Sequence, residues 1–263
     1  MPLRFNLNAL IVSKLTTVVK GNPGVLPPVI EGSMTTLGLE SRYEGPIREA
    51  TVRVAGRSIV LVRPGEPDRL LDDPEVAAWS AAVDYMPYWA YLWPGAFLLA
   101  EAVAVEPCPA GAPALEIGCG LGLAGLVAVA RGLTVRFTDY DRAPLRFVER
   151  SARANGFDPS SYSTAVLDWR DPPADRYSLI FGSDVTYEAR LIPPVARAIA
   201  GLLADDGLAL ISDPNRSSAD GFAAALAAHG LATEATPAEG ESDELGRVRG
   251  RIFRIWRPGA GSG

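Results

Sequence analysis

The chain has 263 residues, of which 48% are hydrophobic and 21% are charged, and its formal net charge is -6. This composition is typical of a globular protein with a substantial core, and the length suits one domain plus a short extension. The negative charge argues against non-specific nucleic-acid binding, which usually requires a basic face. His229 is the only histidine, and Cys108 and Cys119 fit neither a disulfide framework nor a zinc site. Most hydrolase chemistry that depends on histidine is therefore disfavoured, and no metal site is expected.

We expect three regions along the chain: a loosely packed arm over residues 1–33, an extension over 34–84 and the main domain over 85–258. The sequence has no run of 18 apolar residues, which a membrane-spanning helix needs. Residues 1–20 lack a convincing small-residue cleavage site of the kind that follows a secretory signal. We therefore expect a cytoplasmic protein with no membrane span.

Periodicity predicts the secondary structure of these regions. In the extension, alternating residues at 49–54 and 58–63 predict a β-hairpin, and a short helix is expected over 75–84. Pro94 suits the first turn of a helix that continues over 96–105. Strands and helices then alternate, with expected strands at 114–117, 134–138, 163–167, 178–183 and 208–212 and expected helices at 123–131, 143–155, 189–203 and 219–229. A final antiparallel pair is expected at 231–236 and 251–256.

This alternation predicts an α/β fold with a Rossmann-like sheet of seven strands and helices on both faces. The sheet is expected to be mostly parallel with an antiparallel strand at the C-terminal end, and the hairpin is expected to be a small N-terminal extension. Ligands of such sheets bind at the carboxyl ends of the strands. The motifs that could carry chemistry should therefore lie at those ends.

A glycine-rich loop follows the first strand of the main domain and opens a helix. It reads Glu116-Ile117-Gly118-Cys119-Gly120-Leu121-Gly122. Glycines let the backbone turn sharply and bring its N–H groups against a ligand. A dinucleotide-binding fingerprint would place a further glycine at position 123, which is leucine here.

Acidic residues end the next two strands. Asp139 is placed to take both hydroxyls of a ribose, and Asp168 could accept a hydrogen bond from an adenine amino group. With the glycine loop, this order of motifs resembles the class I methyltransferases, which have a seven-stranded sheet. The resemblance implies S-adenosylmethionine as the cofactor. It also implies that the cofactor-binding residues include Glu116, Gly118, Gly120, Gly122, Asp139, Asp168 and Trp169.

Two further motifs resemble the protein-lysine methyltransferases among the seven-stranded enzymes. The fourth strand ends in D-x-x-Y, with Asp184 and Tyr187, and the segment before helix 96–105 contains W-P-G, beginning at Trp93. The resemblance places Asp184 and Tyr187 beside the transferred methyl group as catalytic residues and Trp93 in the cofactor pocket. Residues 213–216 read D-P-N-R, similar to a segment of the methyltransferases of the electron-transfer flavoprotein β-subunit, which often read D-P-G-R.

The sequence leaves several functions open. A lysine side chain of a protein is the favoured substrate, and the electron-transfer flavoprotein β-subunit is one candidate. Methylation of a small-molecule amine, or of another protein residue such as histidine, is an alternative. A non-catalytic protein that binds the cofactor and acts through a partner is a different class, and intact Asp184 and Tyr187 argue against it. A nicotinamide-dependent oxidoreductase is disfavoured by Leu123. The oligomeric state is not predicted.

Overall fold

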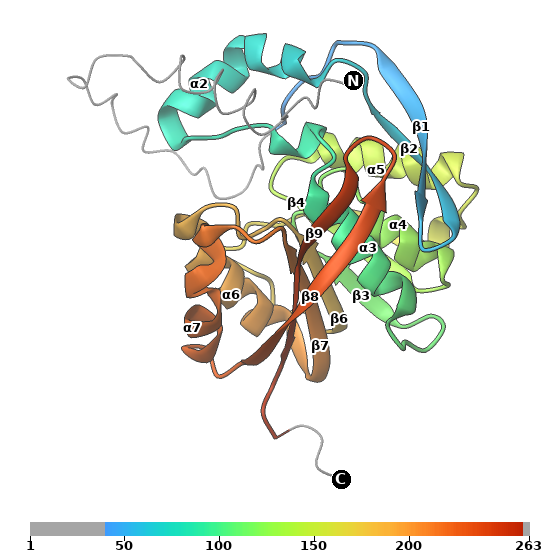
Figure 1. Cartoon of the computed structure of the whole chain (residues 1–263). Coiled ribbons are helices and arrows are strands. Elements are labelled where there is room, and N and C mark those ends of the chain that lie inside the picture. The colour runs from blue at the N-terminus through green and yellow to red at the C-terminus, as the bar shows by residue number, and fades with distance from the viewer. Residues whose placement is uncertain (1–39, 260–263) are drawn as a thin grey trace, which may run out of the picture. The chain divides into compact units, whose positions relative to one another are not determined.

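The computed structural model describes residues 40–259 and contains a seven-stranded sheet (Figure 1). The arm expected over residues 1–33 lies outside the described residues. The strand order is β5-β4-β3-β6-β7-β9-β8. The first five strands in this order pair in parallel, and β9 pairs antiparallel with both β7 and β8. The strands are β3 (Pro113–Glu116), β4 (Thr134–Asp139), β5 (Tyr162–Val166), β6 (Tyr177–Ser183), β7 (Leu203–Asp213), β8 (Ala232–Ser242) and β9 (Gly246–Trp256). The predicted fold is confirmed.

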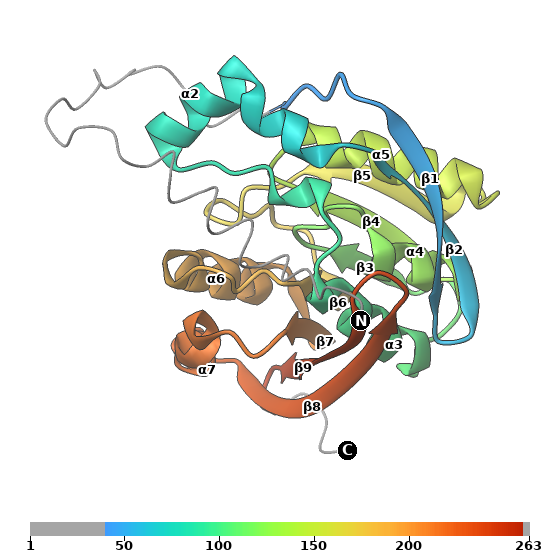
Figure 2. The same cartoon turned by 45° about the horizontal axis from the view of Figure 1, so that its top comes forward.

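Helices cover both faces of the sheet, as Figure 2 shows. One face carries α3 (Pro94–Val105), α4 (Leu123–Ala130) and α5 (Arg142–Ala154). The other carries α6 (Ile192–Leu202) and α7 (Phe222–Ala227). Successive residues of a strand point to opposite faces. Leu210 of β7 accordingly packs in the cluster under α3 and α4, whereas Ile211 packs in the cluster under α6.

The hairpin lies against the outer side of these helices. β1 (Ile47–Val54) and β2 (Arg57–Pro64) pair antiparallel as a separate two-stranded sheet. β2 contributes Ile59 and Leu61 to the core. Two of its backbone N–H groups donate hydrogen bonds of 2.9 Å to the side chains of Asn155 and Ser151 at the end of α5. These bonds satisfy the outer edge of β2, where backbone groups would otherwise lack partners. After the hairpin, α2 (Pro74–Val83) begins at the cap residue Asp73.

The structure differs from the expected elements mainly near the C-terminus. β8 and β9 are each longer than predicted and pair throughout, with a tight turn at residues 243–245. The acidic stretch after residue 238 lies outside the predicted strand 231–236, but it continues β8 to Ser242, where alternate residues are partly buried and β8 packs on α3. The helix predicted over 189–203 begins as a 3-10 turn at Ala189–Leu191, and Pro193 and Pro194 then lie in the first turn of α6.

Candidate active site

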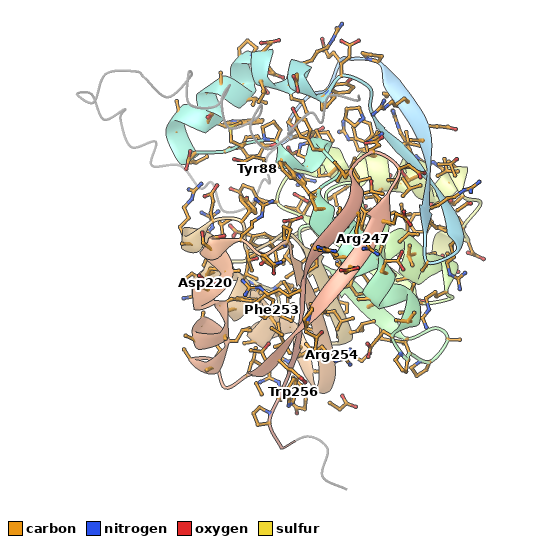
Figure 3. The ribbon with its side chains drawn as sticks, in the orientation of Figure 1. Tyr88, Asp220, Arg247, Phe253, Arg254 and Trp256 are labelled. Carbon is orange, nitrogen blue, oxygen red and sulfur yellow. The ribbon has the colours of Figure 1, made fainter. Side chains whose placement is uncertain are left out.

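The carboxyl ends of β3, β4, β5, β6 and β7 bring the predicted site residues to one edge of the sheet. Parallel strands present these ends together, which is why ligand sites form there. Seven of the ten predicted residues are partly exposed: Trp93, Gly118, Gly120, Asp139, Asp168, Trp169 and Tyr187. The other three, Glu116, Gly122 and Asp184, are buried. Figure 3 labels Tyr88, which lies toward this edge, and Trp256 at the opposite end of the domain.

The glycine loop between β3 and α4 has a backbone that side chains would disfavour. Gly118, Gly120 and Gly122 have φ of 58°, 50° and 73°, in the left-handed region that glycine adopts without strain. At Gly118 a Cβ would also lie 2.8 Å from the ring of Trp169. The loop therefore runs directly against Trp169, and its sequence pattern follows from both the turn and this contact.

Asp139 ends β4 beside the loop. One carboxylate oxygen accepts the N–H of Gly120 at 3.0 Å, and the other accepts the N–H of Asp141 at 3.1 Å. Burial raises the pKa of Asp139 to about 6, although these hydrogen bonds oppose the rise. A carboxylate has about four acceptor positions, so the hydrogen bonds from Gly120 and Asp141 do not use all of them.

Asp141 anchors the extension at this edge, a role that the sequence did not suggest. Its carboxylate caps α5 through the N–H of Ala143 at 2.8 Å and accepts the hydroxyl and N–H of Ser41 at 2.5 and 3.1 Å. It also accepts the hydroxyl of Tyr85, and Trp89 donates to the Ser41 hydroxyl at 3.1 Å. This buried network fixes the segment before α3 next to Asp139.

Asp168 and Trp169 follow β5. Arg170 donates to both oxygens of Asp168 at 2.6 to 3.0 Å. Burial acts to raise the pKa of Asp168, but the hydrogen bonds and charge of Arg170 outweigh it and lower the pKa. The carboxylate is therefore ionised and already has a cationic partner at this edge.

Glu116 lies inside the domain and is only 1% exposed. Its carboxylate accepts the N–H of Gly125 at 3.1 Å in the first turn of α4, where N–H groups have no partner within the helix. Burial raises the pKa of Glu116 well above its ordinary value. Glu116 thus joins the end of β3 to the first turn of α4.

Asp184 follows β6 and connects to the W-P-G segment. It has φ of 54°, a left-handed conformation that is uncommon outside glycine. Its Oδ2 accepts the N–H of Gly95 at 2.7 Å, at the second position of α3, where the helix dipole favours an anion. Its Oδ1 accepts Nε and Nη2 of Arg216 at 3.1 and 3.0 Å. Burial raises the pKa of Asp184, and Arg216 and Gly95 counteract the rise.

Residues at the end of β7 hold this pair in place. Ser212 donates to the carbonyl of Gly95 at 2.7 Å. Asp213 is fully buried and accepts the N–H of Arg216, the Nε of Arg251 and the hydroxyl of Thr186 at 3.0, 3.1 and 3.2 Å. The loop after β7 is thus tied to both β9 and the loop after β6.

Three aromatic rings line the edge beside Asp184. Tyr187 and Tyr88 meet edge to face with centroids 5.2 Å apart, and Tyr88 meets Trp93 in the same way at 5.8 Å. The indole of Trp93 donates to the carbonyl of Tyr88 at 2.8 Å, and the guanidinium of Arg216 lies 5.7 Å from the Trp93 ring. Burial raises the pKa of Tyr187, so its phenol stays protonated. These rings form a largely apolar wall that carries two phenol hydroxyls, those of Tyr88 and Tyr187.

The sequence motifs did not identify Arg216, Gly95 and Tyr88 as parts of this site. Arg216 and Gly95 stand in motifs that were noted, but their contacts with Asp184 were not anticipated. The rule that strand ends share one edge could have placed Arg216 beside Asp184. No sequence signal separates Tyr88 from the other aromatic residues of its segment.

Comparisons with known proteins support the fold. The 16S rRNA methyltransferase RsmC of T. thermophilus, whose structure contains AdoMet and guanosine, aligns over 80% of this chain and 51% of its own, with a TM-score of 0.54 and 16% identity. The mitomycin 7-O-methyltransferase MmcR aligns over 62% of this chain and 54% of its own, with a TM-score of 0.50 and 18% identity. At such identities these likenesses define the fold, which is that of the Rossmann-like methyltransferases.

A family profile described as lysine methyltransferase matches residues 79–225, which is more than half of the chain. The chain therefore belongs to the lysine methyltransferase family. It is similar to the protein N-lysine methyltransferase METTL21A of Danio rerio, with 31% identity over 39% of this chain and 49% of the relative. The Xenopus tropicalis METTL21A matches at 29% identity over 40% and 51%. The matches thus span about half the length of these relatives.

Residues 40–259 contain neither a candidate membrane span nor a candidate metal cluster. No helix in that part of the chain is long and apolar enough to cross a membrane. Within the same residues, no cluster of three or more histidine, cysteine, aspartate or glutamate side chains could hold a metal ion.

Proposed function

We propose that this protein transfers a methyl group from S-adenosylmethionine to the side-chain nitrogen of a lysine in a protein substrate. The observation that carries the proposal is the placement of Asp184 and Tyr187 at the carboxyl edge, beside the glycine loop, in a chain of the lysine methyltransferase family. Asp184 is buried, forms an ion pair with Arg216 and accepts the N–H of Gly95. A fixed carboxylate at a ligand edge is a common sign of a functional group.

The residues at the edge fit S-adenosylmethionine. Asp139 lies beside the glycine loop and accepts the N–H of Gly120 and of Asp141, and we propose that its remaining acceptor capacity binds the hydroxyls of a ribose. We propose that Gly118 and Gly120 present the backbone to the cofactor and that Trp93 borders its pocket. Trp169 and Asp168 would hold the adenine, with Asp168 sharing its acceptors with Arg170. Glu116 and Gly122 would contribute by shaping the loop.

When bound, S-adenosylmethionine supplies a sulfonium methyl group to an attacking nitrogen. The pKa of a free lysine amine is about 10.4, so only about one in a thousand is neutral near pH 7. Only the neutral amine has a lone pair with which to attack. The site must therefore bind the amine without its extra proton, which leaves to water, and hold the nitrogen in line with the methyl group.

Asp184 and Tyr187 would orient the lysine amine toward the methyl group. A free lone pair of Asp184 can accept one N–H of the amine, and the ring of Tyr187 with Tyr88 can exclude water from the lysine stem. The Tyr187 phenol is kept protonated by burial, so it serves as a donor rather than as a base. No dedicated general base is needed, because the proton is lost before the transfer.

The test is incubation of the purified protein with radiolabelled S-adenosylmethionine and lysate of its source organism, resolved on a gel. A labelled protein whose label maps to lysine supports the proposal. The first purified substrate to try is the electron-transfer flavoprotein β-subunit, because residues 213–216 resemble its methyltransferases. An Asp184→Asn variant, which keeps the size of the side chain, provides the matched control. Label only in small molecules would favour amine methylation. No label, with cofactor binding intact, would favour a non-catalytic partner protein.

A further inference from the structure

The hydrogen bonds of Asp184 leave room for only one more donor. Both Nε and Nη2 of Arg216 bind Oδ1, and the N–H of Gly95 binds Oδ2. These bonds use three of the about four acceptor positions of a carboxylate. The remaining position, on Oδ2, suits a single N–H. A neutral amine can use it and still direct its lone pair elsewhere.

The charge of Asp184 is also balanced. Arg216 stays protonated at any physiological pH and forms an ion pair with Asp184 at 3.0 Å. A carboxylate without such a partner would hold an incoming lysine as an ammonium ion and raise the pKa of that lysine. With Arg216 in place the pair is neutral, and an ammonium ion gains little by binding there.

The other charged groups around Asp184 do not upset this balance. Asp213, at the end of β7, is paired with Arg251 of β9 and with the N–H of Arg216. α3 contributes the backbone N–H of Gly95. Tyr88 and Tyr187 present phenols whose pKa values are raised by burial, so they remain neutral.

Farther along the same loop, Glu188 is paired with Arg190. Asp184, the carboxyl group that is proposed to face the substrate, thus has Arg216 as its cationic partner.

We propose that Arg216 is a positioning residue that neutralises Asp184, so that the substrate lysine binds as a neutral amine rather than as an ammonium ion. The inference rests on the proposed lysine methylation. Arg216 is itself held firmly in this position. Its N–H is bound by Asp213, its carbonyl accepts a hydrogen bond from Arg251 at 3.3 Å, and its guanidinium lies against the Trp93 ring.

The test compares Arg216→Gln with the wild type across pH 6.5 to 10. The probe is the protein labelled in the lysate experiment, purified and used at saturating concentration, so that kcat reports on the bound amine. We expect Arg216→Gln to raise the apparent pKa of kcat by at least one unit, which lowers kcat about tenfold or more near pH 7. The deficit should shrink as the pH rises, because the amine is then deprotonated in both enzymes.

Two variants separate charge from structure. Arg216→Lys keeps the cation with a poorer geometry, so its pH profile should stay close to that of the wild type even if kcat falls. Its intact mass is measured as well, because a lysine there could itself accept methyl groups. Arg249→Gln removes an exposed cation that pairs with Glu239 rather than with the residues around Asp184, so it should leave the apparent pKa of kcat unmoved.

A loss in Arg216→Gln that is the same at every pH would overturn the inference, because a purely structural role predicts that result. A second measurement needs no substrate. The ¹³C carboxyl resonance of Asp184, identified by its loss in Asp184→Asn, should titrate at higher pH in Arg216→Gln than in the wild type, and equal titration would refute the pairing. If the wild type labels no protein, the proposed function itself fails, and this inference falls with it.

Discussion

Replacement of Gly95 by alanine should displace the carboxylate of Asp184. The N–H of Gly95 donates to Asp184 at 2.7 Å, and a Cβ at this position would lie 2.8 Å from the Asp184 Cγ and closer still to Oδ2. Ordinary contacts begin near 3.4 Å, so we expect that the carboxylate must move by about 1 Å. A misplacement of about 1 Å in an active site can cost about 100-fold in rate, which corresponds to about 2.7 kcal/mol of activation free energy.

The assay is single-turnover methyl transfer at saturating S-adenosylmethionine, with cofactor affinity measured separately by calorimetry. We expect an about 100-fold slower transfer and unchanged cofactor affinity, since Gly95 contacts Asp184 rather than the glycine loop. Overpacking should also lower the free energy of unfolding by about 1–3 kcal/mol. Gly221→Ala is the control, because Gly221 has φ of -84° and a Cβ added there would meet no atom within 4 Å. Transfer at the wild-type rate by Gly95→Ala would refute this account of Asp184.

Three further predictions concern the acids of the site. Because the pKa of Asp139 is about 6, the affinity for S-adenosylmethionine should fall below that pH, by about tenfold at pH 5. Calorimetry should show this fall in the wild type but not in Asp139→Ala, which should bind weakly at every pH. Asp184→Ala should keep the cofactor affinity of the wild type but lose methyl transfer, and normal turnover would show that Asp184 has no part in the reaction. For Glu116, burial raises the pKa above 4.5, so the folded protein binds this proton more tightly than the unfolded chain. The resulting stability is fully present below about pH 4.5 and is lost as the pH rises through the raised value. Urea unfolding should therefore show Glu116→Gln gaining stability relative to the wild type from pH 5 to pH 8, whereas a constant difference would contradict the buried, proton-binding state of Glu116.

The charge balance at Asp184 connects these predictions with the chemistry of lysine. In the proposed reaction, a buried carboxylate alone would favour the ammonium form of the substrate lysine, and Arg216 lies 3.0 Å from Asp184 and offsets its charge. Asp139 has a different proposed role, which is to accept the hydroxyl groups of a ribose beside the glycine loop, where it already accepts the N–H of Gly120. The two acids therefore have different environments at the ends of β4 and β6, which β3 separates in the sheet, and their variants should separate cofactor binding from transfer.

The sequence by itself determined the order of the elements and the position of each motif at a strand end. Short-range sequence patterns are enough to determine these features. The alternation of apolar residues sets the strands, and glycine adopts the loop conformation at Gly118 without strain. Asp139, Asp184 and Tyr187 could be singled out because each follows a predicted strand, and the parallel topology brings strand ends together. The hairpin was likewise readable from its two alternating segments.

Only the tertiary structure decided how those residues are paired. Asp184 receives its hydrogen bonds from Gly95 and Arg216, which lie 89 and 32 positions away in the chain, and no periodic pattern encodes such contacts. The burial of Glu116 and the anchoring of Ser41 by Asp141 likewise depend on segments that meet only after the sheet has formed. The length of β8 was underestimated for the same reason, because its acidic end is strand only where it pairs with β9 and packs on α3. Local sequence sets what each segment can form, whereas the charge state and direction of each side chain follow from the neighbours that folding supplies.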